Sequence, residues 1–386
     1  MLKIPYYKPS IPKDWNLILA DSIKSGWLTT GPIVNEFEHQ LSKVLGFKNT
    51  IAVNSCTGAL HLALAAKGFG KGDKFIVPTF TFVASVSCGE FLGMEPILID
   101  CAKNNFHINI NDIEKHLKQD SSIKAIIPVH FAGYQVNMED IFNLAEKYNI
   151  FVLEDAAHLI GHQSPKNKFR YNNYAQAYSF YANKNITTLG EGGALTTDDE
   201  EFALRVRRLS LHGITKDGWD RYAGGKWEYD VLDLGFKYNM PDIAASFGLW
   251  QLSKMDIWQN RRKEIAKQYL NGLMNINGVI LPDIDITDSA LHLFILRFEL
   301  KKWKISRNEI IDKLIEMGIS IAVHYKPIHL FTYYQKKYGY AYGDFPEAEK
   351  LYNSTISLPF YPDLKNNEIN YIINVISSLA KKYTAQ

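Results

Sequence analysis

The stretch SFYANKNITTLGEGG, residues 179–193, places Lys184 just after an apolar run that predicts a strand, and a glycine-rich turn follows the lysine. In α/β proteins with a parallel sheet, ligands bind at the carboxyl ends of the strands, so Lys184 lies where functional residues are expected. A partly desolvated lysine has a lowered pKa and can attack a carbonyl group to form a Schiff base. A lone lysine is far more often a solvated surface residue. The interpretation of Lys184 therefore depends on the rest of the sequence.

The residues around this stretch predict an α/β sheet. Between residues 50 and 200, short apolar runs alternate with helical patterns, which is typical of a parallel sheet covered by helices on both faces. Seven strands are predicted, at residues 50–53, 74–77, 96–99, 123–128, 151–154, 177–180 and 194–197, with helices at residues 59–67, 82–92, 138–147 and 200–211.

The pattern changes after residue 211. Residues 212–231 are rich in Gly, Trp, Tyr and Asp and predict a long loop, and residues 241–270 predict a helix with one apolar face. Strands are predicted at residues 291–300 and 319–324, and helices at residues 307–317 and 367–382. We therefore expect a large domain with the N-terminal segment at residues 1–254 and a small α/β domain at residues 255–386.

Composition excludes several classes of protein. The chain has 386 residues, of which 46% are hydrophobic and 22% charged, with Lys+Arg 43 against Asp+Glu 41, so it is neither disordered nor fibrous. The net charge of +2 gives no general attraction to nucleic acid or to an anionic membrane. No apolar run of about 18 residues predicts a membrane span, and the first residues are too often interrupted for a signal peptide. Three cysteines without metal spacing predict neither disulfides nor a metal site, so a cytoplasmic protein is expected.

A second candidate segment is FVLEDAAH, residues 151–158, in which an apolar strand ends on Glu154 and Asp155. A carboxylate buried at that point needs donors or a cationic partner, because an isolated buried charge is costly. A protonated pyridine nitrogen would be such a partner. The alternative is that the two acids only cap the next segment. His158 and His162 have a spacing that metal ligands on a helix can show, but Gly161 intervenes and no third ligand is evident, so no metal is expected.

A third segment, NSCTGALHL at residues 54–62, separates a strand from a helix with small and hydroxylated residues. The Thr57 hydroxyl and free backbone N–H groups at a helix N-terminus form a natural phosphate site. An ordinary Ser or Thr N-cap is the alternative. Phe80 and Phe82 follow the next strand, and either could stack on a planar cofactor or belong to the core.

Together these segments resemble the DegT-type sugar aminotransferases, pyridoxal-phosphate (PLP) enzymes with the aspartate aminotransferase (type I) fold. The resemblance covers nearly the whole chain. Further matching segments, in the same order, are SGWLTTGP (25–32), GFKYNM (235–240), HYKPIH (324–329) and SLP (357–359). The resemblance implies a mostly parallel seven-stranded sheet between helices, with a small α/β C-terminal domain, and makes the catalytic interpretation of Lys184 the favoured one.

The resemblance also implies a role for each matching residue. Lys184 would hold PLP as a Schiff base and later move a proton between the substrate carbon and the cofactor, with pyridoxamine phosphate as the intermediate form. Asp155 would pair with the pyridinium nitrogen, His158 would lie against the ring or its 3′-oxygen, and Phe82 would stack on the ring. The phosphate would bind Thr57, Ser179 and the N–H groups of Gly58 and Ala59. Two residues would reach the cofactor in the neighbouring subunit of a homodimer, Lys237 and Asn239. The sugar would be contacted by Trp27, Thr29, His324 and His329.

The implied reaction moves an amino group from L-glutamate to a keto group, at C4, of a nucleotide-linked keto-deoxy sugar used for cell-surface polysaccharide, lipopolysaccharide or glycan synthesis. Residues 212–222 and the Lys237/Asn239 pair most resemble the UDP-4-keto-pentose aminotransferase of lipid A modification. Cys56, Gly58 and Tyr181 depart from the common family pattern, which more often has Gly, Ala and His at these positions. The alternatives are a 3-keto-sugar aminotransferase, a sugar 3-dehydratase, which uses histidine in place of the lysine, and a non-catalytic PLP-binding regulator.

Overall fold

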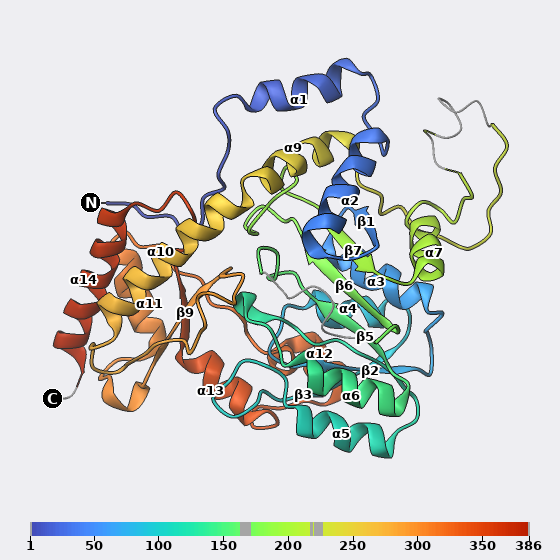
Figure 1. The fold of residues 1–386 in the computed structure, drawn as a ribbon. Helices are drawn as coiled ribbons and strands as arrows, with labels where there is room; N and C mark the ends of the chain where they lie inside the picture. The colour runs from blue at the N-terminus through green and yellow to red at the C-terminus, as the bar shows by residue number, and fades with distance from the viewer. Residues whose placement is uncertain (1, 163–170, 217–218, 220–226, 385–386) are drawn as a thin grey trace.

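A seven-stranded sheet forms the centre of the larger part of the molecule (Figure 1). The computed structural model describes residues 2–162, 171–216, 219 and 227–384. The strands are β1 (Asn49–Val53), β2 (Lys74–Pro78), β3 (Glu95–Ile99), β4 (Ile123–Ile126), β5 (Phe151–Asp155), β6 (Tyr174–Ser179) and β7 (Gly193–Thr197), in the spatial order β1-β7-β6-β5-β4-β2-β3.

The predicted mostly parallel sheet is confirmed, and β7 is the exception. It runs antiparallel to both of its neighbours, β6 and β1, whereas the pairs from β6 to β3 are parallel. Parallel neighbours need a crossover connection, which is usually a helix. The chain between β6 and β7 is the Lys184 loop and contains no helix, so β7 returns antiparallel beside β6.

Helices cover both faces of this sheet. One face carries α3 (Cys56–Ala66), α4 (Ala84–Glu90) and α7 (Glu200–Ser210), which share a core with Phe151 and Leu153 of β5. The other face carries α2 (Pro32–Leu45), α5 (Ile110–Gln119), α6 (Met138–Tyr148) and α9 (Asp242–Ser253), with Val152 of β5 in the core beneath α5 and α6. Side chains alternate along a strand, so Asp155 belongs to the face that α3 covers and Glu154 to the opposite face.

The chain leaves this sheet along two consecutive helices. The predicted helix 241–270 is α9 followed by α10 (Met255–Leu273), with the break at Lys254. A three-stranded antiparallel sheet follows, with β9 (Phe294–Phe298) between β8 (Val279–Ile280) and β10 (Thr355–Leu358). With α10, α11 (Arg307–Glu316) and α14 (Asn366–Tyr383) it encloses a second core.

One prediction for the C-terminal part is wrong, and one feature of that part was not predicted. Residues 319–324 form no strand, because they pair only through single bridges, Ile4 with Ile319 and Ala322 with Ser357. The helices α12 (Thr332–Tyr338) and α13 (Pro346–Ser354) return to the large sheet, where Tyr334 and Leu351 belong to the core that contains Phe151.

The N-terminal helix α1 (Trp15–Lys24) lies at the edge of the molecule, packed against α9 (Figure 1). Its Trp15, Leu17 and Ile23 side chains are exposed. In the part of the chain that the structure describes, no helix combines the length and apolarity required to cross a bilayer. Of the predicted loop 212–231, residues 217–218 and 220–226 lie outside the described residues.

Candidate active site

Lys184 lies in the loop that joins β6 to β7, at the carboxyl end of β6. Its backbone N–H donates to the carbonyl oxygen of Tyr181 (2.9 Å), and Ala182 N–H donates to Gly190 O (2.9 Å), so the loop is closed by its own backbone. Burial lowers the pKa of the Lys184 amine to about 8, against the opposing effect of Asp155 and Cys56. An amine with this pKa has a neutral, nucleophilic fraction near neutral pH, which is the form that attacks an aldehyde.

Asp155, the last residue of β5, presents a buried carboxylate to the same region. Its Oδ2 accepts a hydrogen bond from the Ser85 hydroxyl (2.6 Å), and its Oδ1 accepts one from the backbone N–H of Ala157 (3.1 Å). Among the described residues, no ion pair joins Asp155 to a cation. A buried carboxylate that has neutral donors alone is suited to a cationic ligand atom, and a protonated pyridine nitrogen fits that requirement.

His158, Tyr325 and Phe82 form an aromatic group beside these two residues. The backbone N–H of Ala132 donates to His158 Nδ1 (3.2 Å), and burial lowers the pKa of His158, so the neutral ring carries its proton on Nε2. That nitrogen lies 3.1 Å from the Tyr325 hydroxyl oxygen. The ring of Phe82 lies 5.8 Å from that of Tyr325 and is 55% exposed, which leaves a free face for a planar ring.

The structure adds Tyr325 and Ser85 to the residues singled out from the sequence. Tyr325 lies in the HYKPIH segment (324–329), in which the sequence predicts a role only for the two histidines. Ser85 had no signal of its own, because one serine in a short helix is unremarkable without the carboxylate it contacts. The position of Tyr325 directly after His324 is the sequence signal that could have identified it.

The predicted phosphate site lies at the first turn of α3. Ser179 ends β6 beside it and is buried. Two of the predicted donors already have partners in this chain, since Gly58 N–H donates to Ser55 Oγ (3.0 Å) and Ala59 N–H to Ser55 O (3.0 Å). This corrects the expectation that the N–H groups of Gly58 and Ala59 are free; the Thr57 and Ser179 hydroxyls remain the candidates for the phosphate.

A glycine allows β7 to approach this turn closely. A Cβ atom on Gly193 would lie 2.4 Å from the carbonyl carbon of Ser55 and 2.5 Å from the backbone nitrogen of Cys56, which is closer than real atoms come. The end of β7 and the start of α3 are therefore in direct backbone contact. This approach brings the Lys184 loop and the candidate phosphate site together.

Lys237 and Asn239 lie beside β1, with Asn239 in an antiparallel bridge to Val53. Lys237 Nζ donates to Asn239 Oδ1, and Asn239 Nδ2 donates to Thr30 Oγ1 (2.7 Å). Lys237 is exposed, although partial burial lowers the pKa of its amine. The pair is thus held at the surface, where the prediction that it serves a neighbouring subunit can be tested.

The four predicted sugar contacts differ in their surroundings. Trp27 is half-buried, with Nε1 donating to Thr30 O (2.9 Å), and Thr29 is exposed. His324 lies next to Tyr325 in the chain, its Nδ1 is 2.8 Å from Ser357 Oγ, and burial lowers its pKa to about 4.

His329 is fully buried. Its Nδ1 is 2.8 Å from Thr79 Oγ1 and its Nε2 is 3.0 Å from Glu349 Oε1, so both ring nitrogens have partners within the chain. This geometry gives His329 a structural role and does not support the predicted sugar contact.

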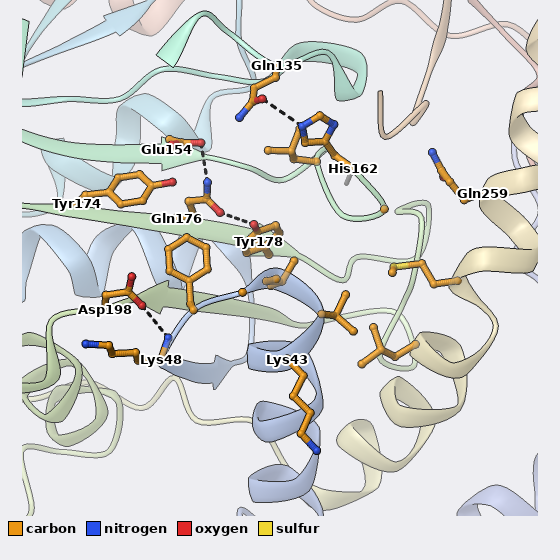
Figure 2. Close-up of a pocket in the computed structure, with 18 of the residues that line it drawn as sticks. Lys43, Lys48, Gln135, Glu154, His162, Tyr174, Gln176, Tyr178, Asp198 and Gln259 are labelled. Atoms are coloured by element: carbon orange, nitrogen blue, oxygen red, sulfur yellow. Dashed lines mark hydrogen bonds between the residues drawn. The ribbon is translucent and has the colours of Figure 1, made fainter. Parts of the chain in front are cut away.

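A cavity of about 1180 Å³ lies on the other face of the sheet (Figure 2). Glu154, Gln176 and Tyr178 line it, and Gln176 donates to Glu154 Oε2 (2.9 Å) while Tyr178 donates to Gln176. His162 lies across the cavity, 3.1 Å from Gln135 (Figure 2). The alternation of Glu154 and Asp155 along β5 therefore separates this cavity from the site that contains Lys184. Across the described ranges, no three His, Cys, Asp or Glu side chains gather as metal ligands.

A buried lysine of low pKa, a carboxylate at a neighbouring strand end and an open aromatic face on this sheet define a PLP-dependent aminotransferase. The chain belongs to the DegT/DnrJ/EryC1/StrS aminotransferase family, whose model matches residues 9–377. It is 40% identical over 381 residues to the spore coat polysaccharide biosynthesis protein SpsC of Bacillus subtilis, covering 98% of this chain and 97% of SpsC.

Solved structures agree with this assignment. The putative sugar aminotransferase Spr1654 of Streptococcus pneumoniae, in its PMP form, is 33% identical, with a TM-score of 0.90 over 98% of this chain and 100% of that chain. The Helicobacter pylori aminotransferase PseC, involved in pseudoaminic acid biosynthesis, is 27% identical, with a TM-score of 0.89 over 99% of this chain and 100% of that chain. The type I fold and the PLP cofactor expected from the sequence are thereby confirmed.

Proposed function

We propose that this sugar aminotransferase moves an amino group from L-glutamate to the C4 keto group of a nucleotide-linked keto-deoxy sugar, for synthesis of a cell-surface polysaccharide. The observation that carries the proposal is the Lys184 amine, whose pKa burial lowers to about 8, placed near the Asp155 carboxylate. Lys184 also argues against a sugar 3-dehydratase, which lacks this lysine. SpsC, a spore coat polysaccharide biosynthesis protein, and PseC, an aminotransferase involved in pseudoaminic acid biosynthesis, support a sugar substrate for this chain.

The preference for C4 over C3 comes from the Lys237/Asn239 pair and from residues 212–222. Of the latter, residues 217–218 and 220–222 lie outside the described residues. Trp27, Thr29 and His324 are the proposed sugar contacts. The rings of Trp27 and Trp219 lie 5.1 Å apart, so one proposed sugar contact touches the 212–222 segment on which the preference for C4 rests.

When bound, PLP supplies an aldehyde and an electron-withdrawing ring. Asp155 would hold the protonated ring nitrogen, and hydrogen bonds from Ser85 and Ala157 fix the orientation of the Asp155 carboxylate. Phe82 and His158 confine the ring. The neutral Lys184 amine would hold the cofactor, and the same amine would accept the proton from the donor carbon and deliver a proton to the sugar carbon.

The active enzyme is proposed to be a homodimer in which Lys237 and Asn239 complete the partner's site. Several large apolar side chains near them are exposed, with Leu234 at 94% and Trp227 at 80%. The exposed face of α1 adds Trp15 and Leu17. Burying such side chains against a second copy would remove exposed apolar surface from water.

A spectroscopic experiment tests the proposed function. Purified protein with PLP should show a visible absorption band that L-glutamate bleaches and that a 4-keto nucleotide sugar restores. Lys184→Ala should lack the lysine-bound band, whereas Lys43→Ala, which removes a lysine on the opposite face of the sheet, should retain it. A panel of 3-keto and 4-keto sugars with UDP, dTDP or GDP then identifies the acceptor. A band that responds to no amino donor would contradict the proposal and favour a regulator.

A further inference from the structure

Asn185, the residue after Lys184, is a buried side chain whose polar groups all have partners. Its Nδ2 donates to the carbonyl oxygens of Ile160 (3.0 Å) and Ala290 (2.7 Å), and its Oδ1 lies 3.1 Å from His292 Nδ1. Because a carbonyl oxygen can only accept, the first two contacts fix which amide atom is nitrogen. His292 Nδ1–H therefore donates to Asn185 Oδ1.

These partners come from segments that are far apart in the sequence. Ile160 follows β5 on the large sheet, whereas Ala290 and His292 precede β9 in the C-terminal part. The same C-terminal segment is held by backbone bonds to the turn η1 (Phe131–Gly133), since Ala290 N–H donates to Gly133 O (2.9 Å) and His292 N–H to Ala132 O (3.0 Å). The Asn185 amide therefore joins three segments directly beside Lys184: the Lys184 loop itself, the turn at Ile160 and the C-terminal residues 290–292.

We propose that Asn185 is a positioning residue that holds the Lys184 amine inside the site and links its placement to the docking of residues 289–293. The inference rests on the proposed function in taking Lys184 as the group that binds the cofactor. Adjacent residues share a peptide plane, so a side chain fixed by three buried bonds also fixes the direction from which Lys184 enters the site. A misplacement of 1 Å at a reacting group reduces the rate on the order of 10²-fold.

The pKa of Lys184 reports whether its amine lies inside the site, because burial is the main cause of its lowered value. Burial lowers its pKa, while Asp155 on β5 and Cys56 on α3 favour the charged amine. His158, His292 and His324 also face it, and burial lowers the pKa of each, so they are neutral. A lysine that swings out into water loses the burial effect, and its pKa rises toward the ordinary value of about 10.4. Loss of folding stability alone would leave this pKa unchanged.

The experiment measures the pKa of Lys184 in the full-length protein freed of cofactor. Propionaldehyde and cyanoborohydride label the neutral amine, and mass spectrometry follows labelling of Lys184 against pH. The pH of half-maximal labelling, about 8 in the wild type, should rise by about one unit or more in Asn185→Ala. Asn185→Ser, which retains one donor, provides a milder second variant, with a smaller shift in the same direction. Transamination kcat should fall on the order of 10²-fold in Asn185→Ala.

Gln259→Ala is the matched control. Gln259 is also a buried amide: its Nε2 donates to Ser289 O (2.9 Å), in the segment that Asn185 contacts, and it lines the cavity on the face of the sheet opposite the Lys184 site. It should lower the unfolding temperature without moving the pKa of Lys184. If Asn185→Ala and Asn185→Ser lower the unfolding temperature and leave the pKa unchanged, Asn185 is only structural and the inference is overturned. A wild type that fails to transaminate would instead overturn the proposed function, because the labelling experiment does not depend on it.

Discussion

At Lys184, burial and a neighbouring carboxylate act on the amine in opposite directions, and burial dominates. The pKa is lowered from 10.5 to about 8, so the folded protein resists the charged form that the unfolded chain prefers. Between about pH 8 and pH 10.5, the unfolded state binds more protons than the folded state. Stability therefore rises with pH across this window, and below it the buried charge is a cost to the folded state.

Replacing Lys184 by methionine should therefore stabilise the cofactor-free protein. At pH 7 we expect Lys184→Met to raise the free energy of unfolding on the order of 1–3 kcal/mol, because an apolar chain of similar length replaces a desolvated amine. The gain should shrink as the pH approaches 10.5. Denaturant unfolding at pH 7 and pH 10 measures both effects, and an equal or larger gain at pH 10 would contradict the burial argument.

We expect Ser85 to affect cofactor binding through Asp155, the residue proposed to hold the ring nitrogen. Its hydroxyl donates to Asp155 Oδ2 and must therefore accept from the Thr81 hydroxyl, 2.8 Å away. Ser85→Ala removes a charge-assisted bond of about 1.5–3 kcal/mol, so we expect the PLP dissociation constant to rise roughly 10-fold or more. Ser85→Thr should restore it. Ser87→Ala, on the same helix, serves as the control in a fluorescence titration with PLP, where an unchanged affinity in Ser85→Ala would refute the role.

At the scale of the elements, the contact between β7 and α3 depends on Gly193. A methyl group there would overlap the backbone of Ser55 and Cys56, and backbone atoms cannot move aside as a flexible side chain can. Gly193→Ala should destabilise the protein by about 2–4 kcal/mol and weaken PLP binding, because the first turn of α3 and the Lys184 loop are forced apart.

Gly70→Ala is a suitable comparison, since a Cβ there meets only one backbone oxygen at an ordinary 3.5 Å. It should leave both the unfolding temperature and the PLP affinity close to the wild-type values. Thermal unfolding and PLP titration of the two variants test the argument, and equal effects at both glycines would contradict it.

The large sheet could be predicted almost strand by strand, because its strands are continuous apolar runs bounded by turns. What could not be predicted was the direction of β7, since residues 194–197 have the same apolar pattern in either direction. The break at Lys254 was missed because the apolar face continues across it. Residues 319–324 alternate like a strand, but their neighbours offer only single bridges, a tertiary fact absent from the local pattern.

The candidate active site could be predicted only in part, because some of its residues matter through contacts across the fold that the local sequence does not show. Lys184 and Asp155 stand in recognisable segments at strand ends, so their meeting follows from the topology. Ser85 and Asn185 are common polar residues whose importance arises from contacts across the fold. The partners of Gly58 N–H and Ala59 N–H depend on the Ser55 side chain and on helix geometry, which residue type alone does not determine.

At the scale of the whole molecule, the proposed dimer predicts that two inactive variants complement each other. Lys184→Ala lacks the lysine proposed to bind the cofactor, and Lys237→Ala with Asn239→Ala lacks the groups proposed to enter the partner's site. In a randomly mixed population half of the dimers are hybrids, each with one intact site, so activity should recover to about a quarter of the wild-type value. Activity of the separate and mixed proteins, with mass photometry of the dimer, tests this. No recovery among mixed dimers would mean that each site is complete within one chain.

The return of α12 and α13 to the large sheet has a consequence for how the protein is made. Tyr334 and Leu351 belong to the same core as Phe151, so that core stays incomplete until more than nine-tenths of the chain has left the ribosome. During synthesis, the large sheet therefore keeps apolar surface exposed to water until α12 and α13 are made. Transient intermediates of large proteins are prone to aggregate at this stage. Truncation before residue 328 should yield a chain that depends on chaperones, even though every residue of the Lys184 loop and of the first turn of α3 is already present.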